Sequence, residues 1–202
     1  MKALFLLAVL VLAGGAVALT SSPGDTARPT VAEPLSEASI YQLSSTWTTS
    51  SGRILALESL AGRPLLVAMV FTHCAFACPR IVDEIKSVLR DLPENGRPGV
   101  VLVSIDPERD TTEVMARFAE VHGLDEPQWL LLQGTETTVR ELAAVLNVQY
   151  RRNPDGEFAH SNTITLLDAG GEISARPEGL DSDRTSFIES VRAGLRRVNQ
   201  AG

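Results

Sequence analysis

Two apolar runs and four amphipathic stretches dominate the pattern of this chain. Residues 65–71 and 100–105 are apolar at almost every position, which is typical of strands that are covered on both faces. Apolar residues three or four positions apart predict helices in four stretches: 79–91, the segment after Asp110, 136–147 and 183–198. In the second of these, the spacing assigns four side chains to the core: Val114, Met115, Phe118 and Val121.

Shorter strands complete the pattern. They are expected at 46–48, 54–57, 129–132, 163–167 and 172–175. The first two flank a Ser-Ser-Gly turn and predict an N-terminal β-hairpin, and the last two flank a glycine-rich turn. Strands that alternate with helices and end in a hairpin predict an α/β fold, with a mixed sheet flanked by helices on both faces.

The N-terminal part of the chain differs from the rest. Residues 1–18 combine a charged start, an apolar core and Ala16-Val17-Ala18, the pattern of a cleaved signal peptide; an uncleaved membrane anchor is the alternative. Residues 19–38 are rich in proline and lack periodicity, so we expect a flexible linker. The remaining segment, 39–198, is long enough for one domain with its own core. The sequence thus predicts an exported domain, periplasmic or at the outer face of the cytoplasmic membrane.

Composition and motifs exclude several classes of function. The chain of 202 residues has a net charge of −7 and a pI near 5.0, with no basic stripe, so a nucleic-acid partner is not expected. No glycine-rich phosphate loop, His-Glu-x-x-His zinc helix or nucleophile elbow is present.

Both cysteines lie where the first apolar run meets the helix that follows it. Three residues separate Cys74 from Cys78, and Pro79 suits the first position of a helix. The peptide dipole at a helix N-terminus favours a thiolate, so we expect a lowered pKa for Cys78. A structural disulfide bond is the plain alternative in an exported domain, although so short a loop would add little stability.

The spacing of the cysteines bears on the kind of chemistry. Disulfide exchange in thioredoxin-like proteins typically uses two intervening residues rather than three. The extra residue relaxes the geometry of a disulfide, while both sulfurs can still approach one Cu(I) ion, which accepts two or three soft ligands. Thioredoxin-like oxidoreductases also carry a proline before the strand that faces the cysteines, and residues 157–163 contain none. The pattern favours a copper site and leaves dithiol exchange open.

Of the three histidines, His160 is the candidate third ligand. It lies in an expected loop, 158–162, before the strand that starts at 163, on the side of a thioredoxin-like sheet where the cysteines lie. Position alone does not separate a ligand from a surface histidine here. His73 is expected to point away from Cys74, and His122 precedes Gly123 at a helix end, where a capping role explains it.

The acidic residues after the second apolar run are expected to have structural roles. Asp110 and Glu113 have the form of a helix N-terminal capping pair. Asp106 directly follows the run and is expected to face the cysteines.

Three sequence elements together resemble the Sco/SenC family of copper-binding assembly factors of cytochrome c oxidase. They are Phe71-Thr72-His73-Cys74-x-x-x-Cys78-Pro79, then Val-Ser-Ile-Asp-Pro-Glu-Arg-Asp-Thr over 103–111, and His160 before a strand. The chain departs from many members in having Ala75-Phe76-Ala77 between the cysteines and Ala159 before the histidine.

The resemblance implies a thioredoxin-like fold and one copper ion, Cu(I) or Cu(II), bound by Cys74, Cys78 and His160. It also implies the copper-accepting subunit of cytochrome c oxidase as partner, together with a copper donor chaperone or a thioredoxin-like reductant. Two functions therefore stand side by side. The first is a copper metallochaperone. The second is a thiol–disulfide oxidoreductase, in which Cys74 would attack and Cys78 would resolve the mixed disulfide.

Overall fold

The structure is a computed structural model that describes residues 35–74, 77–176 and 184–201. All of them belong to one compact unit, residues 34–202. The predicted signal peptide and most of the predicted linker lie outside the described residues. Among the described helices, none is both long and apolar enough to cross a membrane.

A seven-stranded mixed sheet forms the centre of the domain, in the order β2-β1-β5-β4-β3-β8-β9. Its strands are β1 (Thr46–Thr49), β2 (Ile54–Ala56), β3 (Leu65–Val70), β4 (Gly99–Ser104), β5 (Trp129–Gln133), β8 (Ile164–Leu167) and β9 (Ile173–Ala175). β3, β4 and β5 are parallel neighbours, and the outer strands pair antiparallel to them. The mixed sheet expected from the sequence is confirmed.

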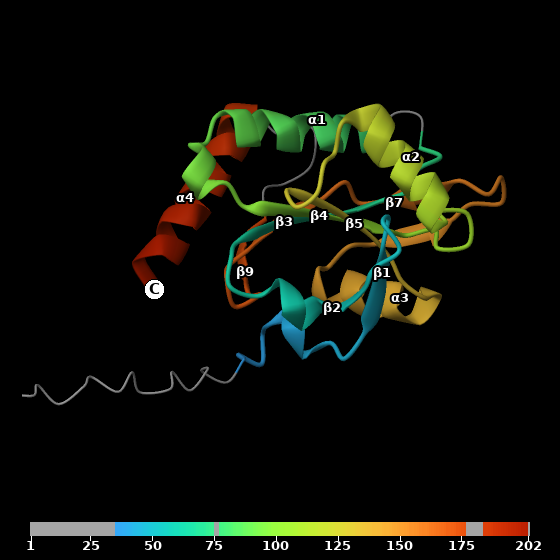
Figure 1. The fold of residues 1–202 in the computed structure, drawn as a ribbon, viewed down its shortest axis with the longest axis horizontal. Coiled ribbons are helices and arrows are strands. Elements are labelled where there is room, and N and C mark those ends of the chain that lie inside the picture. Colours follow the sequence, from blue (N-terminus) through green and yellow to red (C-terminus); the bar gives the residue numbers. More distant parts are fainter. Residues whose placement is uncertain (1–34, 75–76, 177–183, 202) are drawn as a thin grey trace, which may run out of the picture. The chain divides into compact units, whose positions relative to one another are not determined.

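Helices cover both faces of this sheet. They are α1 (Ala77–Arg90), α2 (Thr112–His122), α3 (Glu136–Val145) and α4 (Arg184–Ala201), with short 3₁₀ helices at Ile40–Gln42, Leu57–Leu60 and Glu94–Gly96. Figure 1 shows α1 and α2 on one face of the sheet and α3 on the other. Because β3 and β4 are covered on both sides, every residue of both strands is buried. The continuous apolar runs therefore have the structural reason that the sequence suggested.

The N-terminal hairpin is part of the central sheet. β1 pairs with β2 and also with β5, where Thr48 lies opposite Gln133. Trp47 of β1 is buried against Gly134, directly after β5. A Cβ atom at position 134 would lie 2.6 Å from the Trp47 ring, so the close approach of these segments requires glycine.

The segment around His160 differs from the expected loop. Strands β6 (Tyr150–Arg152) and β7 (Phe158–His160) form a separate two-stranded antiparallel sheet. The turn between them is closed by Asn153 N–H, which donates to the carbonyl of Glu157 at 2.7 Å, and Gly156 takes the left-handed conformation that the turn needs. His160 is thus the last residue of a strand, where its backbone direction is fixed by pairing with Tyr150.

Helix α2 departs from its expected packing. Met115 and Phe118 are buried, but Val114 is half-buried and Val121 is 73% exposed. The expectation that all four side chains enter the core is wrong for Val121. The periodicity identifies an apolar stripe on α2, and this stripe is wider than the part of the helix surface that the sheet covers.

Replacement of Leu102 by alanine tests the importance of the central strand. Leu102 of β4 is fully buried, so its truncation should lower the free energy of unfolding by about 2–5 kcal/mol. Ile54→Ala is the matched control, because Ile54 is 72% exposed and its truncation should change stability by no more than about 0.5 kcal/mol. Urea denaturation of the reduced protein measures both. Equal losses would contradict the assignment of β4 to the core.

Candidate metal and dithiol site

The two cysteines lie at the carboxyl end of β3, in unequal surroundings. Residues 71–74, called the cysteine loop below, leave β3, and the N–H of Cys74 donates to the carbonyl of Phe71 at 3.2 Å. Both thiols are free and hydrogen-bonded to each other. Cys74 is half-buried, whereas Cys78 is fully buried and accepts a hydrogen bond from the N–H of Phe71 at 3.4 Å. Cys74 is therefore the thiol that an external group can reach.

Burial reverses the expected pKa shift of Cys78. The residue does lie in the first turn of α1, where the helix dipole favours a thiolate. Removal of the thiol from water outweighs this and raises the pKa of Cys78 well above its usual value, and the nearby Cys74 and Asp110 raise it further. The hydrogen bond from the N–H of Phe71 acts in the opposite direction. The prediction of a lowered pKa is wrong, because the side chain faces the core.

His160 lies near the cysteine loop through Phe71. Its ring packs edge-on against that of Phe71, with 5.7 Å between the ring centroids. Nδ1 lies 3.3 Å from the carbonyl oxygen of Ser161, which can only accept, so Nδ1 carries the proton and Nε2 presents a lone pair. Burial lowers the pKa of His160, which favours the neutral ring. Nε2 is buried and finds no hydrogen-bond partner among the described residues.

The three expected ligands do not form a closed cluster. In the described part of the chain, one group of three or more potential ligand residues has its donor atoms all within 4.8 Å of one another, and it consists of His73, Asp106 and Asp110. Cys74, Cys78 and His160 do not meet that limit as a set. Their joint role as metal ligands stays a prediction.

Asp110 accounts for much of the geometry of the cysteine loop. Its carboxylate is fully buried and accepts hydrogen bonds from the N–H of Thr72 at 3.2 Å and from its hydroxyl at 2.5 Å. The hydroxyl of Ser104, the last residue of β4, donates to the other oxygen at 2.6 Å. Asp110 is not the expected helix cap, because Thr111 caps α2 by accepting from the N–H of Val114. The carboxylate instead ties the cysteine loop to the end of β4.

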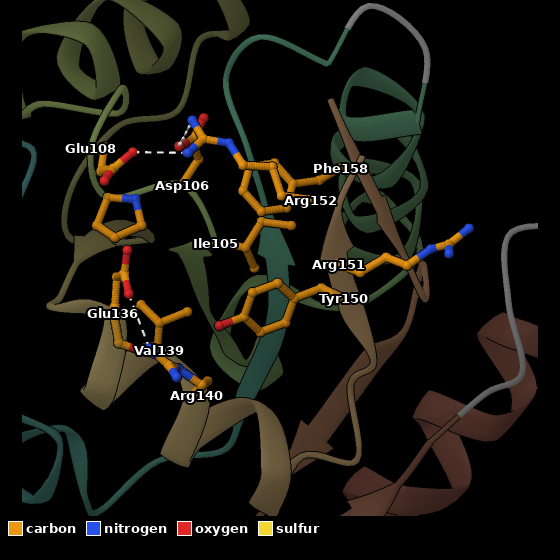
Figure 2. Close-up of a pocket in the computed structure, with 11 residues that line it drawn as sticks. Ile105, Asp106, Glu108, Glu136, Val139, Arg140, Tyr150, Arg151, Arg152 and Phe158 are labelled. Carbon is orange, nitrogen blue, oxygen red and sulfur yellow. Dashed lines mark hydrogen bonds and ion pairs between the residues drawn. The ribbon is translucent and has the colours of Figure 1, made fainter. Parts of the chain in front are cut away.

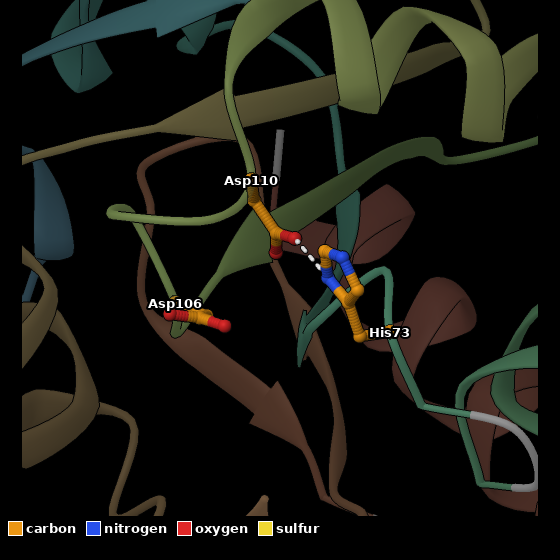
Figure 3. Close-up of side chains that lie close together, drawn as sticks. All are labelled: His73, Asp106 and Asp110. Atoms are coloured by element: carbon orange, nitrogen blue, oxygen red, sulfur yellow. Dashed lines mark ion pairs between the residues drawn. The ribbon is translucent and has the colours of Figure 1, made fainter. Parts of the chain in front are cut away.

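His73 and the two aspartates do not offer an open cation site. Figure 3 shows Nδ1 of His73 directed at Asp110, 3.6 Å from Oδ1. The oxygens of Asp110 are engaged by Thr72 and Ser104, and Asp106 is paired with Arg109. The proximity of these groups is explained by the way in which they hold the loops together.

The turn at residues 106–110 also holds the hairpin that carries His160. Nε of Arg109 donates to Asp106 Oδ2, and NH2 of Arg109 donates to the carbonyl of Gly156 at 2.8 Å. This hydrogen bond to Asp106 raises the pKa of Arg109. Arg152 of β6 pairs with Glu108 at 2.9 Å and lies 3.9 Å from Asp106. One turn thus contacts both the cysteine loop and the β6–β7 hairpin.

A cavity of about 320 Å³ lies between this turn, α3 and the hairpin. Figure 2 shows its apolar wall of Ile105, Val139 and Tyr150, with the Arg152–Glu108 pair at one side. Neither cysteine nor His160 lines it. The cavity therefore lies beside the 106–110 turn, which contacts the hairpin, and the candidate ligands do not line it.

His122 has a structural explanation. It is the last residue of α2, before the left-handed C-cap Gly123, and its ring packs at a tilt against Phe118 with 4.3 Å between centroids. This agrees with the helix-end position expected from the sequence.

These features define an α/β domain with one accessible and one buried thiol at the end of a central strand. A sequence model of the SCO1/SenC family matches residues 35–195, and the chain belongs to that family. The human mitochondrial SCO2 homologue is 31% identical over 157 residues, a match that covers 72% of this chain and 55% of that protein. The chain thus spans about half the length of this curated relative.

Solved structures show the same fold. ScoI from Arabidopsis thaliana, solved with copper bound, has a TM-score of 0.67 at 22% identity over 75% of this chain and 96% of its own. BsSco, described with a disulfide switch as a member of the Sco family of cytochrome c oxidase assembly proteins, has a TM-score of 0.62 at 22% identity over 75% and 91%. The thioredoxin-like fold expected from the sequence is confirmed.

Asp110→Asn tests the carboxylate that anchors the cysteine loop. The amide keeps the shape of the side chain but places an NH₂ group where donors now converge, which should lower the free energy of unfolding by about 1–3 kcal/mol. Asp83→Asn, at an exposed position of α1, should stay within about 0.5 kcal/mol of wild type. Urea denaturation of the reduced protein gives both values. An unchanged stability of Asp110→Asn would show that the hydrogen bonds to Asp110 are dispensable.

Proposed function

We propose that this domain carries copper as its cargo and delivers it during the assembly of cytochrome c oxidase. The Cys74 and Cys78 thiolates and the His160 imidazole would hold the ion, and the copper-accepting subunit of the oxidase would receive it. The observation that carries the proposal is the buried Nε2 of His160, which has no hydrogen-bond partner among the described residues and belongs to a ring that packs on Phe71, the first residue of the cysteine loop. Family membership and the copper-bound relative from Arabidopsis thaliana support it.

The chemistry of the three donors fits copper. Two thiolates and a neutral imidazole are soft or intermediate ligands, which suit Cu(I) in two- or three-coordinate geometry and also bind Cu(II). Burial lowers the pKa of His160, which favours the neutral form that a ligand needs. Copper must displace the protons of both thiols. Because the pKa of Cys78 is raised, this thiol keeps its proton until a metal ion replaces it.

Copper binding by all three donors would require a rearrangement. Bonds of about 2.0–2.3 Å to a first-row metal ion place any two donor atoms within about 4.6 Å of each other. Because Cys74, Cys78 and His160 do not all lie within 4.8 Å of one another, at least two of their donor atoms would have to come closer on loading. The 106–110 turn contacts the cysteine loop and the turn between β6 and β7, and it would guide that approach.

Thiol–disulfide exchange is the second candidate function, because the thiols are free, in contact and unequally exposed. The Cys74 thiolate would attack a target disulfide and form a mixed disulfide, and one target thiol would leave. Cys78 would then attack Cys74 to form the internal disulfide and release the second target thiol. The target gains two electrons and two protons, and the dithiol loses them. A reductant of the thioredoxin class would restore it.

We also infer that the domain works after export. Residues 1–18, with the composition of a signal peptide or anchor, would direct it to the periplasm or the outer face of the cytoplasmic membrane, and residues 19–38 would act as a linker. A copper donor chaperone is the expected source of the cargo.

Copper stoichiometry of the reduced protein tests the proposal. Wild type should retain one copper ion per chain after gel filtration. His160→Ala should bind Cu(II) at least about 100-fold more weakly, since loss of a group that merely orients a ligand already costs about 10–100-fold. Metal analysis and titration against a competing chelator provide the values.

The other histidines serve as comparisons. His122→Ala should retain wild-type copper, because that ring packs against Phe118 at the end of α2. His73→Ala tests whether His73, which neighbours Cys74, is the third ligand in place of His160. Its copper affinity should match that of wild type. If His160→Ala binds copper as wild type does and Cys74→Ser no longer reduces a target disulfide, copper carriage is contradicted. Dithiol exchange would then be the function of the domain.

A further inference from the structure

Helix α2 leaves apolar side chains in solvent beside the reactive thiol. Val121 is 73% exposed and Val114 is half-buried, although both belong to the apolar stripe of the helix. Their exposure is not explained by packing within the described part of the domain. Exposed apolar side chains that gather in one place, unlike single scattered ones, mark interaction sites.

These side chains line one wall of a groove that ends at Cys74. The groove has a volume of about 300 Å³, and its α2 wall includes Val114, Phe118 and Val121. Residues of the cysteine loop and Pro79 also line it, including Cys74, which is half-buried. Cys78 is not among the lining residues. A molecule that occupies the groove therefore meets Cys74 first.

The charge of the groove is opposite to that of the protein. Arg117 lines it, and the side chain of Arg117 makes no ion pair with any described residue. No carboxylate is found among the described residues that line the groove, whereas the whole chain has a net charge of −7. An acidic occupant is therefore favoured over a basic one.

We propose that this groove, which we call the α2 groove, docks an extended segment of a partner protein that carries a cysteine flanked by apolar and acidic side chains. The apolar side chain would contact Phe118 and Val121, the acidic one would face Arg117, and the cysteine would lie against Cys74. This inference rests on the proposed function, since Cys74 is the thiol through which copper or electrons reach the partner.

A peptide disulfide provides a direct probe. The probe is the blocked peptide Glu-Leu-Cys-Leu-Glu, with its cysteine joined to a thiopyridyl group through a disulfide bond. The Cys74 thiolate attacks the peptide sulfur, a Cys74–peptide disulfide forms, and the bond to the pyridyl sulfur breaks. The leaving thiolate takes up a proton and is measured by absorbance as thiopyridone. Uncharged dipyridyl disulfide reports the reactivity of the thiol without docking.

Two surface variants separate docking from thiol chemistry. Arg117→Glu should lower the second-order rate constant for the acidic peptide about tenfold at low salt and raise it for the same peptide with lysines in place of the glutamates. Both changes should shrink as the salt concentration rises. Val121→Ser should slow both peptides severalfold, because each loses the same apolar contact. All variants should react with dipyridyl disulfide at wild-type rates.

Matched controls lie elsewhere on the surface. Ile54→Ser removes an equally exposed side chain from β2, and Arg196→Glu reverses an exposed charge on α4; both should behave as wild type with every probe. The proposal is overturned if Arg117→Glu matches Arg196→Glu with the acidic peptide, or if dipyridyl disulfide slows in parallel. A wild-type rate constant that falls as protein concentration rises would overturn it by assigning the groove to a second copy of this chain.

The assay contains no copper, so the two proposals fail separately. If copper binding is normal but Arg117→Glu does not change the rate with the acidic peptide, the docking proposal alone fails. If copper binding does not depend on the three proposed ligands but Arg117→Glu still slows the acidic peptide, the copper proposal alone fails. The groove would then dock a disulfide-exchange partner.

Discussion

A buried carboxylate holds together the segments that meet at the cysteine end of the sheet. Asp110 accepts hydrogen bonds from the backbone and hydroxyl of Thr72 and from Ser104. Because a buried carboxylate is tolerated only when its oxygens are paired, the cysteine loop and the end of β4 are held against each other. The same short turn contains Asp106, which lies close to Arg152 of the β6–β7 hairpin. The position of both cysteines relative to His160 therefore depends on residues that are not ligands.

The parallel arrangement of β3 and β4 explains why the chemistry is found at this edge. Both strands end there, which brings the cysteine loop next to the 106–110 turn, as is usual for sites in open α/β sheets. Burial then makes the two thiols unequal. Cys78 is enclosed with a raised pKa, while Cys74 opens onto the α2 groove. Copper transfer and disulfide exchange would both begin at the same accessible sulfur.

Local patterns in the sequence predicted the elements but not the contacts between distant segments. The uninterrupted apolar runs predicted β3 and β4, and the junction after β3 predicted the place of the cysteines. The role of Asp110 was missed, because its partner Thr72 lies 38 residues earlier and the local pattern resembled a helix cap. The strand that ends at His160 has three residues, too few to show a period. The exposure of Val121 was missed because periodicity identifies an apolar stripe without showing how much of it the sheet covers.

Copper carriage and dithiol exchange share the same sulfurs and differ in the use of the imidazole. Within the described part of the domain the buried Nε2 of His160 has no hydrogen-bond partner, and a metal ion would satisfy its lone pair. X-ray absorption at the copper edge of the loaded, reduced protein examines this directly. Two sulfur neighbours and one nitrogen neighbour are expected, and the nitrogen should disappear when His160 is replaced by alanine. A shell of sulfur alone, or a nitrogen that persists without His160, would contradict the proposed copper site.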